Sequence, residues 1–192
     1  MKKSTIVIIV VVVILVAIIA GLVSNYNGVV SLSEEVDNKF ATIDTMLQRR
    51  ADLIPNLVNT VKGYTNQEQA VIDSVTDARA KLAGANSVGE KANADQELST
   101  ALSNLLVVVE NYPDLKSHAE IADVMQQNSY LQKEITAARD QYNDTVNQWN
   151  HDIFMWPVKM IVAAKAGYTS RIPFTTSFDM KEKARGTFFD NK

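Results

Sequence analysis

Cysteine is absent from the 192 residues, and histidine, glycine and proline are scarce. Without cysteine the chain has no disulfide, no thiolate nucleophile, no Cys-ligated zinc and no iron–sulfur cluster. Two histidines, His118 and His151, are too few for a histidine-rich metal site. Seven glycines and four prolines are too few for the turns of a β-sandwich. The composition thus excludes several catalytic and metal-binding classes together with a turn-dense β fold.

The motifs of common enzymes and cofactor sites are also missing. The sequence contains no Gly-rich phosphate loop, no G-x-S-x-G and no H-E-x-x-H. Helical bundles that bind metals use Glu-x-x-His pairs, but here Gln148 precedes His151 and Leu115 precedes His118 at that spacing. We therefore expect no catalytic residue, no cofactor and no metal, and we expect that the protein is not an enzyme.

One long apolar run is present near the N-terminus. Residues 6–23 carry no charge and no hydrogen-bonding side chain. As a helix this run would rise about 27 Å, close to the roughly 30 Å hydrocarbon core of a bilayer. A cleaved signal peptide is the alternative, but its apolar region is usually only about 7–15 residues long. We expect residues 1–25 to form an uncleaved transmembrane anchor that contacts membrane lipid.

The charges on either side of this run predict its orientation. Lys2 and Lys3 precede it, whereas the first charges that follow are Glu34, Glu35 and Asp37. Because positive charge is retained on the cytoplasmic side, we expect a cytoplasmic N-terminus with the rest of the chain outside.

Beyond the anchor, apolar residues recur at spacings of three and four. Four such stretches cover residues 36–61, 64–82, 98–112 and 121–156, which is typical of amphipathic helices packed as in a coiled coil. Breaks fall at Gly63, at residues 83–89 and at Tyr112-Pro113-Asp114. We expect an all-α protein whose residues 26–166 form an antiparallel up-and-down four-helix bundle. A single helix that continues across Gly63 is the alternative.

Residues 167–192 lack this periodicity and are expected to form an extended tail. From residue 157 onward there are seven Lys/Arg and three Asp/Glu, whereas residues 6–156 have ten and nineteen, respectively. An acidic bundle repels nucleic acid, so we expect no such partner. The basic tail either contacts anionic lipid or lies against the bundle, and the candidate lipid contacts are Lys181, Lys183 and Arg185.

Two sets of polar residues lie on or beside the apolar stripes. Glu68 and Glu110 are expected to pair with Arg79 and Arg139 across helices, as register-fixing ion pairs or, alternatively, as a proton or ion site. The second set shares one helix face at i, i+4 and i+7: Asn143, Asn147 and Asn150. That face could be solvated or dock a partner, but we favour hydrogen bonds between helices. The adjacent aromatic and Met side chains fit a core better than a membrane-interface belt: Trp149, Phe154, Met155 and Trp156.

Several longer motifs resemble the LemA family. They include LQRRADLIPNLV at residues 47–58, VKGY at 61–64, ENYPDLK at 110–116 and YND at 142–144, and the resemblance covers residues 1–185. Phe40-Ala41 departs from it, because many relatives carry Trp there. The resemblance implies a bacterial single-pass membrane protein with a soluble four-helix domain. It implies no established enzymatic activity and no agreed catalytic residues, and one subgroup takes part in magnetosome membrane formation.

The residues and the resemblance together predict a membrane-anchored interaction or scaffold module of the bacterial cytoplasmic membrane. Its partner would be another protein or a second copy of the chain. One alternative is a protein that organises the membrane by binding lipid through its tail. Another is a bundle that binds a cofactor or ion through its buried Glu and Arg residues.

Overall fold

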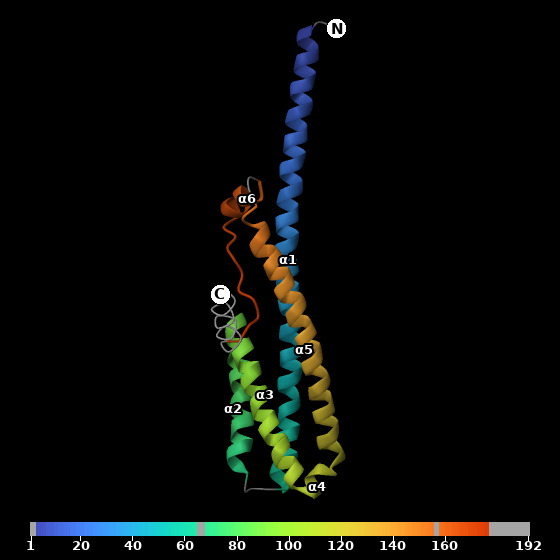
Figure 1. Ribbon diagram of the computed structural model, residues 1–192, viewed down its shortest axis with the longest axis vertical. Helices are drawn as coiled ribbons and strands as arrows, with labels where there is room; N and C mark the ends of the chain where they lie inside the picture. The colour runs from blue at the N-terminus through green and yellow to red at the C-terminus, as the bar shows by residue number, and fades with distance from the viewer. Residues whose placement is uncertain (1–2, 65–67, 156–157, 177–192) are drawn as a thin grey trace, which may run out of the picture. The chain divides into compact units, whose positions relative to one another are not determined.

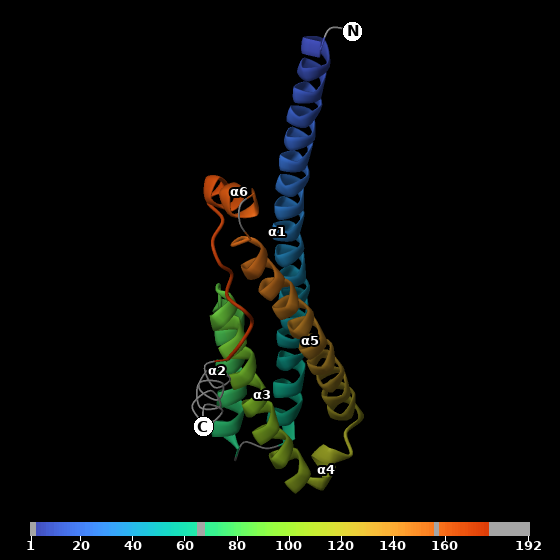
Figure 2. The ribbon, with the colours of Figure 1, turned by 45° about the horizontal axis from the view of Figure 1, so that its top comes forward.

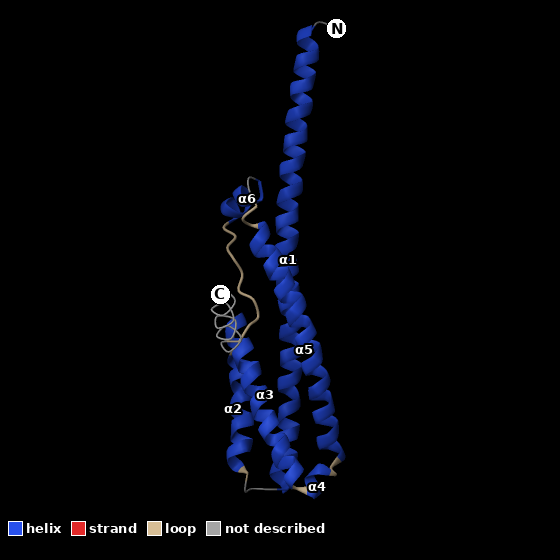
Figure 3. Cartoon of the chain, in the orientation of Figure 1, coloured by secondary structure: helices blue, strands red, loops and turns tan. Residues whose placement is uncertain are grey.

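A computed structural model describes residues 3–64, 68–155 and 158–176, and all regular structure within these ranges is helical (Figures 1 and 3). The helices are α1 (Lys3–Tyr64), α2 (Gln69–Gly84), α3 (Val88–Asn111), α4 (Pro113–Lys116), α5 (Ala119–Asp152) and α6 (Val158–Ala166). The all-α prediction is therefore confirmed, including a long apolar N-terminal helix.

The chain divides into two compact units. The N-terminal unit comprises residues 1–38 and 144–171, and the central unit comprises residues 39–143 and 172–192. Helices α1 and α5 each contribute residues to both units.

Helix α1 contains the apolar run and continues without a break past residue 25 and past Pro55. The large apolar side chains between Ile8 and Val23 are exposed. Within the described residues α1 alone is long and apolar enough to cross a membrane, with a mean hydropathy of 3.0 over an 18-residue window. A bilayer would cover these side chains, which nothing in the described chain buries.

The central unit buries the apolar stripes that the sequence predicted. Its fully buried side chains come from α1, α2, α3, α4 and α5, and include Ile43, Leu47, Ile54, Ile72, Leu98, Leu105, Leu115 and Ile135. Helices α2 and α3 lie side by side in both views (Figures 1 and 2). Because α1 ends at Tyr64 and α2 begins at Gln69, the alternative of one helix through both stretches is wrong.

The connection between α2 and α3 is shorter than the loop expected at residues 83–89. Helix α2 extends to Gly84, and Ser87 caps α3. The Glu90 backbone N–H donates to Ser87 Oγ at 3.2 Å, while the Ser87 N–H donates to Glu90 Oε2 at 3.0 Å. Backbone hydrogen bonds from Asn86 and Ser87 hold the pKa of Glu90 below its ordinary value. This reciprocal cap starts α3 sharply.

The N-terminal unit packs the end of α5 against α1. Val29, Leu32 and Val36 of α1 are buried in this unit, and so is Trp149 of α5. The core prediction is thus confirmed for Trp149, but it is wrong for Phe154 and Met155, which are exposed. These two residues follow the end of α5 at Asp152 and therefore leave its packed face. Trp156 lies outside the described residues.

Candidate functional site

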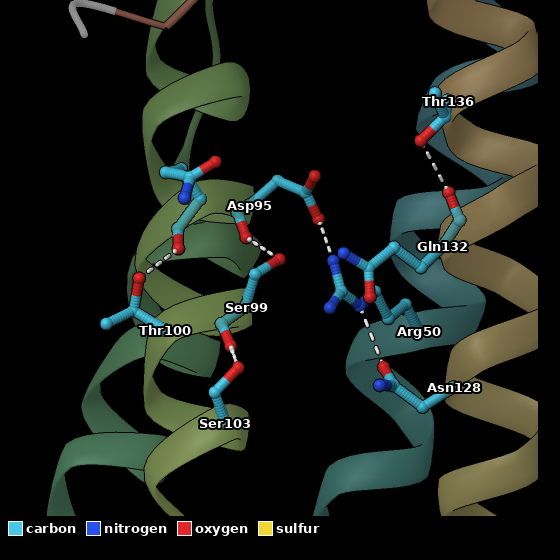
Figure 4. Close-up of polar contacts among 9 residues, drawn as sticks. Arg50, Asp95, Ser99, Thr100, Ser103, Asn128, Gln132 and Thr136 are labelled. Atoms are coloured by element: carbon cyan, nitrogen blue, oxygen red, sulfur yellow. Dashed lines mark hydrogen bonds and ion pairs between the residues drawn. The ribbon is translucent and has the colours of Figure 1, made fainter.

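A buried arginine joins three helices of the central unit (Figure 4). Arg50 of α1 is 1% exposed, Asp95 of α3 is 6% exposed and Asn128 of α5 is 7% exposed. Arg50 Nη1 donates to Asp95 Oδ1 at 2.5 Å, and Arg50 Nε donates to Asn128 Oδ1 at 2.9 Å. We call these three residues the Arg50 cluster.

The Arg50 cluster is suited to a structural role. Arg50 and Asp95 form a buried ion pair, in which each side chain compensates the charge of the other. Arg50 Nη2 is buried without a hydrogen-bond partner among the described residues. The cluster therefore pays a desolvation cost that only correct alignment of α1, α3 and α5 offsets, which favours one register of these helices.

The sequence predicted buried Glu–Arg pairs at other positions. Arg79 Nε instead donates to the Ala51 carbonyl at 3.0 Å, and Glu68 Oε1 accepts from the Tyr112 hydroxyl at 3.4 Å. Glu110 is exposed, and no ion pair in the described ranges joins it or Glu68 to Arg79. The fourth residue, Arg139, places its guanidinium carbon 5.1 Å from the centroid of the Phe174 ring.

In the central unit, an asparagine of α5 binds the backbone of the segment that follows α6. The Phe174 N–H donates to Asn143 Oδ1 at 2.7 Å, and Asn143 Nδ2 donates to the Phe174 carbonyl at 3.3 Å. The Tyr142 hydroxyl donates to the Ile172 carbonyl at 3.0 Å. One side-chain amide thus satisfies both backbone groups of a residue, as a neighbouring β-strand would.

The N-terminal unit repeats this arrangement at Asn150. The Arg171 N–H donates to Asn150 Oδ1 at 2.7 Å, and Asn150 Nδ2 donates to the Arg171 carbonyl at 2.9 Å. Trp149 Nε1 donates to the Thr169 carbonyl at 3.0 Å. We call Asn143 and Asn150, with the residues they bind, the two amide clamps.

The side chain of Arg171 ties the same segment to α1. Its Nη1 lies 2.7 Å from Asp37 Oδ1, and its Nη2 donates to Asp37 Oδ2 at 3.3 Å and to Ser33 Oγ at 3.2 Å. Its guanidinium carbon also lies 5.7 Å from the centroid of the Trp149 ring. Arg171 thereby contacts both helices of the N-terminal unit that pack together.

These contacts correct the interpretation of the asparagine face. Asn143 and Asn150 bind an extended segment, whereas hydrogen bonds between helices were expected, and Asn147 is exposed. The period of three to four residues identified the face but not its partner. The predicted lipid contacts Lys181, Lys183 and Arg185 lie outside the described residues.

A groove on the surface of the central unit lies between α1 and α5. It consists of two adjoining cavities of about 530 and 540 Å³ that share Leu53, Asp123 and Gln127. Five aliphatic side chains contribute to its lining: Leu53, Leu57, Ile121, Val124 and Leu131. Its other lining residues include an exposed Tyr130 and more acidic than basic groups, namely Asp52, Glu120, Asp123 and Arg49. This combination suits an apolar segment flanked by positive charge.

No group of three or more His, Asp or Glu residues in the described part of the chain is placed to hold a metal ion. The ion pair between Asp152 and Lys159 instead joins α5 to α6, with Lys159 Nζ 2.6 Å from Asp152 Oδ2. That hydrogen bond holds the pKa of the Asp152 carboxyl below its ordinary value of 3.8.

The Asp152 pair predicts a pH limit for the docking of α6. A lowered carboxyl pKa gives stability that is present above pH 3.8 and is lost as the pH falls through the folded-state pKa. We expect Asp152→Asn to increase amide hydrogen exchange in α6 several-fold at pH 7, for a loss of about 1 kcal/mol. The exposed Asp144 offers the matched control Asp144→Asn, and equal exchange in the two variants would contradict the role of this pair.

Comparison with known proteins identifies the family of this chain. The sequence model of the LemA family matches residues 39–188. Similar proteins include Magnetosome protein MamQ 2 of Paramagnetospirillum magneticum, 26% identical over 168 residues, and Magnetosome protein MamQ of Magnetospirillum gryphiswaldense, 25% identical over 168 residues. Each match covers 74% of this chain and 62% of the relative, so the chain spans less than two thirds of these proteins. Because the family model covers most of the sequence, the chain belongs to the LemA family, as its motifs predicted.

Proposed function

We propose that this protein is a membrane-anchored helical interaction module and not an enzyme. The observation that carries the proposal is the continuity of α1. One helix contains both the exposed apolar run and Arg50, the buried centre of the central unit. The anchor and the packed domain are therefore parts of the same element, which suits a protein that holds a partner at a membrane surface.

The proposed module is an antiparallel up-and-down bundle of α1, α2, α3 and α5. Two hydrogen bonds between α1 and α5 support opposite directions for these helices. Lys39 Nζ donates to Gln141 Oε1, whereas Arg50 Nε, later on α1, donates to Asn128, earlier on α5. The short connections before and after α3 support the same topology.

We place the binding surface for the partner at the groove between α1 and α5. Its aliphatic lining would bury an apolar helix face, and its acidic groups would attract lysine or arginine at the edge of that face. The occupant is therefore a basic amphipathic helix of another protein. We further propose that the bundle lies outside the bacterial cytoplasmic membrane, because Lys2 and Lys3 precede the apolar run.

Photo-cross-linking in native membranes tests the binding surface and the orientation together. A photoreactive phenylalanine analogue in place of Tyr130 should give a discrete adduct with another protein, since this side chain is exposed at the groove. The same probe at Ser103, an exposed residue of α3 that does not line the groove, should give none. Adducts only with the chain itself would contradict the proposed occupant, and an adduct with a cytoplasmic protein would contradict the orientation.

A further inference from the structure

The corner between α5 and α6 carries a dense group of exposed apolar side chains. Within eight consecutive positions, Phe154 is 64% exposed, Met155 is 44%, Met160 is 46% and Ile161 is 57%. We call these four residues the corner cluster. Scattered exposed apolar residues need no explanation, but four together on a short helix and its entry mark a surface that something covers.

The charged side chains of the corner segment itself are positive. Residues 153–166 contain Lys159 and Lys165 and no acidic residue. Lys165 is exposed, and Lys159 is held by Asp152 at the end of α5. Apolar side chains mixed with lysine on a short helix are typical of helices that lie in the headgroup region of a bilayer.

The N-terminal unit places this corner near the end of the apolar run. Arg171 binds Ser33 and Asp37 of α1 and is itself clamped by Asn150, so the end of α5 lies beside that part of α1. Figures 1 and 2 both show α6 beyond the end of α5, beside α1 and closer to its N-terminal end. Ser33 is ten residues from Val23, about 15 Å of helix.

A tyrosine between Val23 and Ser33 also indicates where the surface of the bilayer would lie along α1. Tyr26 lies three residues after the end of the apolar run and is 50% exposed. Tyrosine favours the boundary between hydrocarbon and water, where its ring is buried and its hydroxyl is solvated. An α1 helix inserted through residues 6–23 would thus bring Tyr26 to the level of the headgroups. The end of α5, with which α6 forms an ion pair, is held against α1 at Ser33 and Asp37, about two to three turns of helix beyond Tyr26.

We propose that the corner cluster and α6 lie in the headgroup layer of the membrane that α1 enters. This contact rests on the proposed insertion of α1 and adds a second attachment point to it. Its ligand is the surface of a bilayer that contains anionic lipid, with the cluster among the upper acyl chains and Lys165 at the phosphates. A unit attached to the membrane at two points cannot rotate freely about the axis of α1. The N-terminal unit would therefore present a fixed face to the membrane.

The absence of cysteine permits a direct test with single-cysteine variants of the full chain. Ile161→Cys reports on the corner, Ile14→Cys on the apolar run, and Ala137→Cys on an exposed position of α5 in the central unit. Each variant is labelled with an environment-sensitive fluorophore and reconstituted into vesicles of phosphatidylcholine and phosphatidylglycerol. A small fraction of the lipid carries a spin-label quencher near the headgroup.

We expect the lipid quencher to lower the fluorescence at Ile161→Cys by about twofold or more and to leave Ala137→Cys unchanged. If Ile14→Cys is protected from a water-soluble quencher while Ile161→Cys behaves like Ala137→Cys, the corner contact is wrong and the anchor stands. If Ile14→Cys is open to the water-soluble quencher, the anchor itself is wrong. Met160→Cys provides an independent reporter on the same helix and must agree with Ile161→Cys.

Discussion

Arg50→Ala is expected to lower the free energy of unfolding by about 3–5 kcal/mol, because it leaves a buried carboxylate without its partner charge. Asp95 is 6% exposed and its Oδ1 lies 2.5 Å from Arg50 Nη1, so water cannot readily replace the guanidinium. Asn128 loses its donor in the same change. Denaturant unfolding of the full chain in detergent micelles, followed by circular dichroism, measures the difference.

Two further variants separate the charge from the loss of a long side chain. Arg49 is the exposed neighbour of Arg50 in the sequence, and Arg49→Ala should change stability by no more than about 0.5 kcal/mol. The double variant Arg50→Met/Asp95→Leu should recover most of the loss, because it removes both buried charges and keeps their volume. If Arg50→Ala unfolds at the same denaturant concentration as Arg49→Ala, the Arg50 cluster does not stabilise the bundle.

The Arg50 cluster also bears on the proposed binding surface. Arg50 and Asn128 lie next to groove residues on their own helices, Arg49 on α1 and Gln127 on α5. Apolar stripes alone allow helices to slip by one turn with little change in buried area, whereas a single buried ion pair fits only one register. The shape of the groove therefore depends on the same contacts that determine stability.

The sequence predicted the kind of buried contact but not its residues. A cross-helix pair of an acid and an arginine does exist, although at Arg50 and Asp95. Arg50 lies three residues after Leu47 and four before Ile54, on the buried stripe of α1. Its position on this stripe was the signal in the sequence that Arg50 is buried. The signal was easy to miss because the neighbouring residue, Arg49, is also an arginine and is exposed. Periodicity shows which face a residue occupies, but it does not show which helix lies opposite.

The docked segment after α6 was less predictable for a different reason. Residues 168–176 form neither helix nor strand, and side chains of α5 satisfy part of their backbone. Such hydrogen bonds require nothing of the side chains of the segment itself, so its sequence shows no period. The spacing of Asn143 and Asn150 was visible, whereas the partner was defined only by the three-dimensional structure.

The second large effect is expected at the amide clamp of the N-terminal unit. Asn150→Ala removes two hydrogen bonds to the backbone of Arg171, each of which contributes about 1 kcal/mol. We expect the segment around Arg171 to open more often, with amide hydrogen exchange faster by about 10- to 30-fold. Hydrogen–deuterium exchange of the full chain in micelles, read by mass spectrometry, covers residues 168–176 in one or two peptides.

A nearby asparagine of α5 provides the matched control for this clamp. Asn147 is exposed on the same helix, and Asn147→Ala should leave exchange of the segment unchanged. Asn150→Asp should restore part of the protection, because a carboxylate still accepts from the Arg171 N–H but cannot donate to its carbonyl. Similar exchange in Asn150→Ala and Asn147→Ala would show that the other contacts of the segment, among them the ion pair between Arg171 and Asp37, hold it without the Asn150 amide. Faster exchange in Asn150→Ala, partly reversed in Asn150→Asp, would identify the side-chain amide as the group that keeps Arg171 against α1 and α5.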